Sequence, residues 1–201
     1  PSGTAVPVRS PARRRRTVAA AAAAAILAAA AVAYFSWTPD STQGHSPGQV
    51  PAQSRAQARE TYGRAKFLLD RRGPGDVERA LQYFEEAIRR DPTYALAWSG
   101  RASANWLQLI EGRIPRAQGL SRVRDSAERA LQLDPTLAEA HLRLANYRWA
   151  VGDPAAAVEH VRRATELEPR NPLVLSFAAS KIADAGRLSE AITLQRRAVE
   201  A

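Results

Sequence analysis

The sequence predicts an all-α protein in which a solenoid of about four helix-turn-helix repeats follows a single transmembrane helix. Two observations indicate the repeats: similar residues recur every 34 positions, and an acidic residue followed by proline ends several helical segments. A third observation indicates the membrane helix, namely a stretch of 21 residues without charge near the N-terminus. A chain of 201 residues has room for one such solenoid and short appendages.

Residues 1–16 form a linker rich in proline and arginine, and they hold much of the positive charge. Five of the 29 basic residues lie there, at Arg9 and Arg13–Arg16, and the total formal charge is +9. Residues 50–201 carry 24 basic and 19 acidic residues, which alternate along the predicted helices. Mixed faces of this kind are typical of solvated helices, so we infer no nucleic acid partner for this segment.

Residues 17–37 are the predicted transmembrane helix. At about 1.5 Å per residue the segment is roughly 30 Å long, which matches the hydrocarbon core of a bilayer. Arg13–Arg16 precede it directly, and Tyr34, Phe35 and Trp37 stand at its far end, where aromatic residues favour the membrane boundary. Because positive charge stays inside, we expect a single-pass protein of a bacterial inner membrane, with residues 1–16 cytoplasmic and the repeats periplasmic or extracellular.

Two other interpretations of residues 17–37 stay open, because 12 of these residues are alanine and the segment is only weakly hydrophobic. The first is a cleaved signal peptide, for which Ala31-Val32-Ala33 would be the cleavage site. The second is an alanine-rich helix that stays in water. In either case residues 17–37 would not anchor the mature protein in a membrane.

Residues 38–54 are expected to form a flexible tether, because they contain Pro39, Gly44 and Pro47. The sequence starts at Pro1 and ends at Ala201 inside a repeat, so we expect it to be a piece of a longer protein. The preference for arginine over lysine and the abundance of alanine are typical of a bacterial genome rich in G and C.

Residues 55–201 contain the repeats. The segments 85–97, 128–140 and 162–174 resemble one another, and each ends a helix at an acidic residue followed by proline. Proline cannot continue the preceding helix but is tolerated in the first turn of the next one. The predicted repeat boundaries are Asp91-Pro92, Asp134-Pro135 and Glu168-Pro169. No repeat buries its apolar stripe alone, so neighbouring repeats must stack.

Small residues recur where the helices are expected to touch, because two antiparallel helices approach closely only if small side chains face each other. Within a repeat, the first helices offer Ala102, Ala145 and Ala179, and the second helices offer Ala157 and Ala191. Between repeats, the second helices offer Ala87, Ala130, Ala164 and Ala198.

This pattern resembles the tetratricopeptide-repeat (TPR) family. The matching residues are Tyr62, Ala80, Phe84, Ala87 and Pro92 in repeat 1 (about 55–92); Trp98, Ala102, Ala127, Ala130 and Pro135 in repeat 2 (95–135); Leu144, Ala145, Ala157, Ala164 and Pro169 in repeat 3 (138–171); and Leu175, Ala178, Ala179, Ala191 and Ala198 in repeat 4 (172–201). The resemblance implies a TPR α-solenoid that binds a protein or peptide. The motif itself is structural and does not name the ligand.

Repeats 1 and 2 depart from the family pattern. Repeat 1 is two residues longer around Gly73-Pro74-Gly75, and repeat 2 has about nine extra residues near Glu111 to Ser121, which we expect to form a loop or extended turn. Arg101 replaces a core leucine, Asn105 an aromatic residue and Lys66 a small residue. These two repeats are therefore expected to pack less tightly than repeats 3 and 4.

The order of linker, span, tether and repeats resembles the C-terminal half of membrane-anchored winged-helix transcriptional regulators of the ToxR/CadC type. That resemblance implies the sensory half of a bacterial transmembrane regulator, whose DNA-binding part would precede Pro1. Similar repeats also follow the span in receptor-like serine/threonine kinases and adenylate cyclases. A structural scaffold for an envelope complex is a further alternative, and self-association of the chain stays open.

In TPR arrays, residues of the first helices that do not pack inward line a concave groove. The candidates for groove binding are Trp106, Arg143, Asn146, Trp149, Phe177 and Ser180. An arginine and an asparagine one turn apart suit a peptide carboxylate or backbone, and tryptophan supplies apolar contact. The competing interpretation is an ordinary solvated helix face. A carboxylate clamp of the Hsp90/Hsp70 type is not expected, because Glu139 stands where that clamp has a lysine.

The sequence predicts no catalytic, metal or cofactor site. There is no cysteine, and the histidines at 45, 141 and 160 lack the spacing of metal ligands. No phosphate loop or Ser/His/Asp set is recognisable. We therefore expect a binding protein that is not an enzyme and has no cofactor.

Overall fold

The computed structural model describes residues 50–201, which form eight α-helices. They are α2 (Ala52–Arg71), α3 (Asp76–Arg90), α4 (Ala95–Ile110), α5 (Arg116–Leu133), α6 (Ala138–Ala150), α7 (Pro154–Leu167), α8 (Pro172–Asp184) and α9 (Leu188–Glu200). The predicted linker, transmembrane helix and most of the tether, within residues 1–49, lie outside the described residues. None of the helices among residues 50–201 combines the length and the apolar character that a membrane crossing requires.

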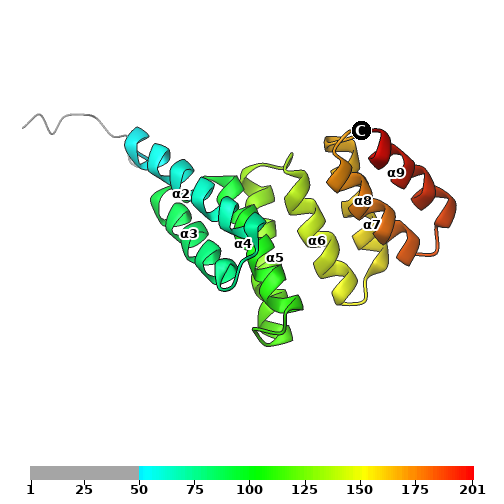
Figure 1. Ribbon diagram of the computed structural model, residues 1–201, viewed down its shortest axis with the longest axis horizontal. Helices are drawn as coiled ribbons and strands as arrows, with labels where there is room; N and C mark the ends of the chain where they lie inside the picture. Colours follow the sequence, from blue (N-terminus) through cyan, green and yellow to red (C-terminus); the bar gives the residue numbers. More distant parts are fainter. Residues whose placement is uncertain (1–49) are drawn as a thin grey trace, which may run out of the picture. The chain divides into compact units, whose positions relative to one another are not determined.

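The helices pair into four hairpins, α2–α3, α4–α5, α6–α7 and α8–α9, which stack in chain order (Figure 1). Each first helix also contacts the first helix of the next hairpin, as α4 contacts α2 and α6. The second helices, α3, α5, α7 and α9, make no such contact with one another within the described part. The array therefore curves with its first helices on the inner face. The predicted all-α solenoid of four repeats is confirmed.

The core lies between helices and consists largely of alanine. Ala102, Ala145, Ala157 and Ala164 are fully buried, so small side chains stand where helices meet, as the repeat pattern predicts. Large side chains fill the remaining space, and the largest of the fully buried ones is Phe84 on α3. The hairpins are thus held together by close backbone approach and a few large apolar residues.

The same hydrogen bonds and the same glycine turns recur at the ends of helices in different repeats. Asp91 and Asp134 each follow a second helix, and each carboxylate accepts hydrogen bonds from the amide and hydroxyl of the threonine two positions later. Gly152 and Gly186 lie between the helices of repeats 3 and 4 with φ of 83° and 79°, a region that favours glycine. These turns fix the 34-residue period in space.

The longer turn of repeat 1 is organised around Asp76. Its carboxylate is 1% exposed, accepts two hydrogen bonds of 2.7 Å from Arg71, and accepts a third of 2.8 Å from the amide of Gly73. The Arg71 hydrogen bond lowers the pKa of Asp76 to about 2. The extra residues of this turn are therefore a structured connection.

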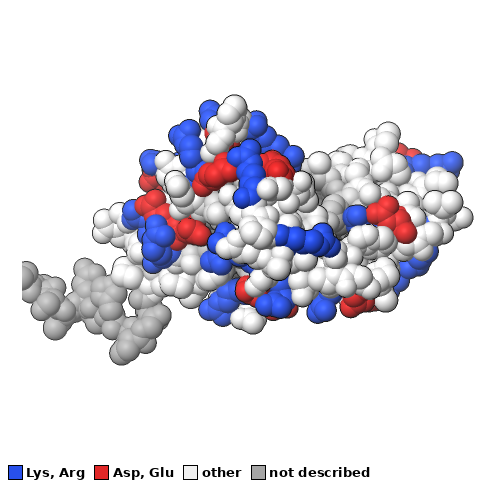
Figure 2. All heavy atoms as spheres, turned by 90° about the horizontal axis from the view of Figure 1, so that it is seen from below, with Lys and Arg blue, Asp and Glu red and all other residues white. Residues whose placement is uncertain are grey.

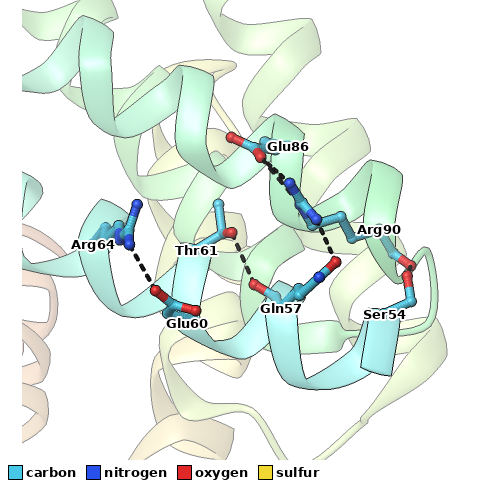
Figure 3. Close-up of polar contacts among 7 residues, drawn as sticks. All are labelled: Ser54, Gln57, Glu60, Thr61, Arg64, Glu86 and Arg90. Carbon is cyan, nitrogen blue, oxygen red and sulfur yellow. Dashed lines mark hydrogen bonds and ion pairs between the residues drawn. The ribbon is translucent and has the colours of Figure 1, made fainter. Parts of the chain in front are cut away.

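Polar side chains join the start of α2 to the end of α3 (Figure 3). Arg90 donates to Glu86 one turn earlier, at 2.6 Å, and to Gln57 of α2, at 2.5 Å. Ser54 donates to the Arg90 carbonyl at 2.6 Å. Because Ser54 already belongs to α2, the helix begins inside the segment that the sequence assigned to the tether.

The insertion in repeat 2 is only in part the loop or extended turn that the sequence predicts. Helix α4 runs to Ile110 and α5 starts at Arg116, so only residues 111–115 form the turn. The extra residues lengthen α4 and α5, which makes this hairpin protrude beyond its neighbours (Figure 1). Gly119 permits the extension, because a side chain there would lie 2.9 Å from Leu109.

Candidate peptide-binding groove

The inner face of the solenoid is formed by α2, α4, α6 and α8, and polar contacts cross it between repeats. Ser103 of α4 donates a 2.8 Å hydrogen bond to Glu139 of α6. Burial and then the charge of Glu139 raise the pKa of Tyr62 on α2 to about 12. The bond from Ser103 to Glu139 therefore joins repeats 2 and 3 across the inner face.

Arg143 on α6 is the central feature of this surface. It lies one turn after Glu139, and burial lowers the pKa of its guanidinium below the usual value. The charge of Glu139 opposes this shift, whereas that of Arg72 at the end of α2 adds to it. The buried Nε of Arg143 has no hydrogen-bond acceptor among residues 50–201. A partly desolvated cation without an acceptor is a suitable site for an anionic group of a ligand.

Other buried polar groups gather on the same two helices. Ser99, Asn105 and Gln108 of α4 are each less than 10% exposed, and each has a side-chain oxygen without a partner in the described part of the chain. Asn105 uses its amide nitrogen for a 2.9 Å hydrogen bond to the Arg101 carbonyl. Buried polar groups normally have hydrogen-bond partners. Helices α4 and α6 therefore offer free hydrogen-bonding capacity in a partly dry environment.

The structure separates the six residues proposed from the sequence. Arg143 is half-buried and Asn146 is buried one turn later on α6, and Trp106 is half-buried on α4. Phe177 packs against the apolar cluster of Ala138, Leu142, Ala164 and Val174 between α6 and α8, whereas Ser180 is exposed.

Trp149 lies at what we call the turn edge, the side of the solenoid where the turns join the two helices of each repeat. There it lines a hollow together with residues of α7, the last residue of α8 and the α8–α9 turn, and Lys181 lies 5.1 Å from the centre of its ring. Trp149 thus faces a second concave surface, which the sequence did not separate from the groove.

Sequence reasoning missed two contributors to the inner face. Tyr62 was assigned only to helix packing, and Lys66 only to a departure from the motif. In the structure the ring of Tyr62 lies 5.3 Å from that of Tyr94, and Lys66 forms a 2.7 Å ion pair with Asp70. The free side-chain oxygen of Asn105 was also missed, and its signal was the replacement of an expected aromatic residue by a polar one.

His141 and His160 meet across α6 and α7, with 3.2 Å between their Nδ1 atoms. The Nε2 of His141 lies 3.3 Å from the Pro135 carbonyl, which can only accept. His141 therefore carries its proton on Nε2 and accepts the Nδ1 proton of His160. Residues 50–201 contain no group of three or more side chains arranged to hold a metal.

Figure 2 shows basic and acidic side chains beside one another on this face, with wide uncharged areas between them. Several form pairs along one helix, such as Arg162 with Glu159 at 2.6 Å and Lys181 with Asp184 at 2.8 Å. The Arg143 side chain is distinguished from these pairs by the burial of its Nε and by the lack of an acceptor there among residues 50–201.

Comparison with known proteins agrees with this architecture. Residues 75–94 and 138–180 match family models of the tetratricopeptide repeat. The structure is similar to TTC0263, a thermophilic TPR protein of Thermus thermophilus, at 23% identity and a TM-score of 0.61, over 77% of this chain and 75% of that chain. The two family models and this shared fold support the resemblance to the TPR family.

Two further solved structures show the same fold. One is the first TPR of Spaghetti (RPAP3) bound to the HSP90 peptide SRMEEVD, at 17% identity and a TM-score of 0.51, over 66% of this chain and 95% of that chain. The other is MamA 41-end from Desulfovibrio magneticus RS-1, at 15% identity and a TM-score of 0.50, over 71% of this chain and 74% of that chain. TPR repeats are typical of protein–protein interaction modules.

Proposed function

We propose that the inner face of α2, α4 and α6 binds an extended segment of another protein and that Arg143 receives an acidic group of that segment. The observation that carries this proposal is the buried Nε of the half-buried Arg143, which has no acceptor in the described part of the chain. A carboxylate would restore the interaction that burial removes. Asn146, one turn after Arg143, would then bind the backbone of the same segment.

The solved structure of the first TPR of Spaghetti with a bound peptide supports this proposal, because that peptide, SRMEEVD, carries acidic residues. The contacts in the present chain would differ from a lysine-based clamp. Glu139 stands one turn before Arg143 and accepts the hydrogen bond of Ser103, so it favours a donor or a cation. We propose a ligand in which an acidic side chain is followed or preceded by a polar or basic one.

The test is selection from a displayed library of random peptides on the whole chain, with Arg143→Gln as the variant. The wild type is expected to enrich peptides with an acidic residue, and Arg143→Gln to bind them about ten-fold to a hundred-fold more weakly, because a hydrogen bond to a charged group contributes about 1.5–3 kcal/mol. Arg163→Gln is the matched control, since Arg163 lies on an exposed face of α7 and pairs with Glu166. Equal binding by the Arg143 variant would refute the role of this residue.

We also propose that residues 17–37 anchor this module in a bacterial inner membrane, as the sensory half of a transmembrane transcriptional regulator. The support is the charge-free run after Arg13–Arg16, followed by a binding module. A structural scaffold for an envelope complex, or the repeat region of a receptor-like kinase or cyclase, fits the same segments. The sequence encoded upstream of Pro1 distinguishes them, since a winged helix favours the regulator.

Extraction of membranes at alkaline pH tests the anchor. We expect the chain to remain with the lipid, and a variant lacking residues 17–37 to be released, because a helix of this length buries its apolar surface only in a bilayer. Sequencing the N-terminus of the mature protein is the companion measurement. A new N-terminus just after Ala33 would show a cleaved signal peptide and would end the anchor proposal.

A further inference from the structure

The turn edge of the solenoid is crossed by two arginines in its first three repeats. Arg113, in the turn of the long α4–α5 hairpin, forms ion pairs with Glu78 of α3 and with Glu111. Arg116, at the start of α5, donates a 2.6 Å hydrogen bond to the carbonyl of Ala150, the last residue of α6. The extension of repeat 2 therefore covers the turn edge toward repeat 1 and toward repeat 3.

Between repeats 3 and 4 the same edge is hollow. A cavity of about 620 Å³ lies there, with an apolar floor that includes Trp149, Pro154 and Val158. Its rim carries two acidic side chains, Glu159 of α7 and Asp184 of α8. The α6–α7 turn is short, so no extension of repeat 3 reaches the end of α8 in the way that Arg116 of repeat 2 reaches the end of α6.

The period of the chain identifies the acceptor that this cavity offers. Asp184 is the last residue of α8 and stands 34 positions after Ala150, the residue whose carbonyl binds Arg116. The backbone hydrogen bonds of the next turn use the carbonyls of Lys181, Ile182 and Ala183, and none among residues 50–201 reaches the carbonyl of Asp184. Carbonyls at the end of a helix favour a cation.

We propose that the cavity at the turn edge of repeats 3 and 4 is a second docking site, which binds an arginine and a neighbouring aliphatic residue of a partner protein. The guanidinium would donate to the carbonyl of Asp184 and to the carboxylates on the rim, as Arg116 does to Ala150 within this chain. The aliphatic side chain would cover the floor beside Trp149. The site would then be separate from the inner face that contains Arg143.

The charges on the rim are consistent with such a guest. Asp184 pairs with Lys181 and Glu159 with Arg162, but both carboxylates remain exposed, by 43% and 68%. Arg187 also lines the cavity, and it is paired with Glu190 at 2.5 Å. The two carboxylates and Arg187 are thus all paired, and the exposed oxygens of the carboxylates can still accept further hydrogen bonds from a guest.

The experiment uses the whole chain in a mild detergent and a synthetic peptide that copies residues 110–118, which include Ile114 and Arg116. Binding is followed by NMR through the indole signal of Trp149. We expect this signal to shift, while the indole signals of Trp98 and Trp106 stay in place. A peptide with Arg116→Ala is expected to bind at least about ten-fold more weakly.

Two variants of the chain make the result specific. Ala155→Trp fills the cavity from an exposed position, and Asp184→Lys reverses the charge of its rim; both are expected to weaken binding at least about ten-fold. Glu166→Lys is the matched control, because Glu166 is an exposed acid of α7 with an i,i+3 partner, as Asp184 is on α8. It should leave binding unchanged.

The proposal is overturned if the peptide does not shift the Trp149 signal, or if it binds the Asp184→Lys and wild-type chains equally. The Arg143→Gln variant tests the inner face and the turn edge separately. It should weaken binding of acidic peptides to the inner face and leave binding of the arginine peptide at the turn edge unchanged.

Discussion

Helices α3 and α4, of repeats 1 and 2, pack closely at Gly100, because this residue of α4 has no side chain. A Cβ at this position would lie 2.2 Å from the ring of Phe84, which is fully buried on α3. Phe84 was predicted from the family motif, because it is an aromatic residue at a packing position of the second helix. The role of Gly100 was not predicted, because the sequence does not show which side chain a glycine inside a helix faces.

Gly100→Ala is expected to destabilise the fold by about 1–3 kcal/mol, because the enclosed ring has little room to move away from the new methyl group. Urea unfolding followed by circular dichroism measures the change. Gly63→Ala is the matched control, since Gly63 lies in α2 with nothing within 4 Å of the added Cβ. That substitution should stabilise by about 0.5–1 kcal/mol through helix propensity. A Gly100 variant as stable as the wild type would contradict the described packing.

Arg143 illustrates what the sequence says about a binding residue. Its position on a first helix predicted the inner face, and the structure places it there, half-buried. The missing acceptor at Nε was not predictable, because it depends on which side chains of α2 and α4 come near. Position in the repeat alone does not identify a binding residue. Phe177 stands 34 positions after Arg143, yet it packs against the apolar cluster between α6 and α8.

Helices α6 and α7 are joined by the pair His141 and His160, and this contact is sensitive to pH. Burial lowers the pKa of both side chains, and the charges of Arg163 and Arg148 lower them further. Their pKa values in the folded state thus lie below the unfolded value of about 6.5. The unfolded chain binds more protons between these values, so stability is complete above about pH 6.5 and falls as the pH drops through the folded pKa.

We expect the melting temperature of the chain to fall by a few degrees between pH 7.5 and pH 5. Differential scanning calorimetry at several pH values measures the shift. His160→Gln should flatten the dependence, because an amide does not titrate in this range. Asp76 and Asp134 do not interfere, since hydrogen bonds hold their pKa values below the usual range. An unchanged slope in the His160 variant would show that other groups cause the effect.

The α4–α5 hairpin shows why an insertion was harder to interpret than a repeat. Gly112 and Pro115 are typical of a turn, and they do lie at the turn between the two helices. The residues after them extend α5, and the decisive contacts, from Arg113 to Glu78 and from Arg116 to Ala150, span about 35 positions of the chain. Local propensity identifies a turn, but the length of the adjoining helices is set by such distant contacts.

The order of the repeats was the best predicted property of the solenoid, because each repeat packs mainly on its sequence neighbours. The 34-residue period, the proline boundaries and the buried alanines together define which helices are adjacent. The period does not fix how each groove residue is oriented, since that depends on insertions such as the one in repeat 2. Trp149, which the sequence assigned to the groove, also lines the hollow at the turn edge.

The contacts among the first helices, and the lack of contacts among the second helices of the described part, have a mechanical consequence. Bending the array more or less tightly changes the spacing of α3, α5, α7 and α9 without breaking any packing between them. The softest deformation of residues 50–201 is thus a change of curvature, with the inner helices as the hinge line. A change in curvature would therefore tighten or loosen the contacts of a ligand bound along the inner helices, without unfolding of any single hairpin.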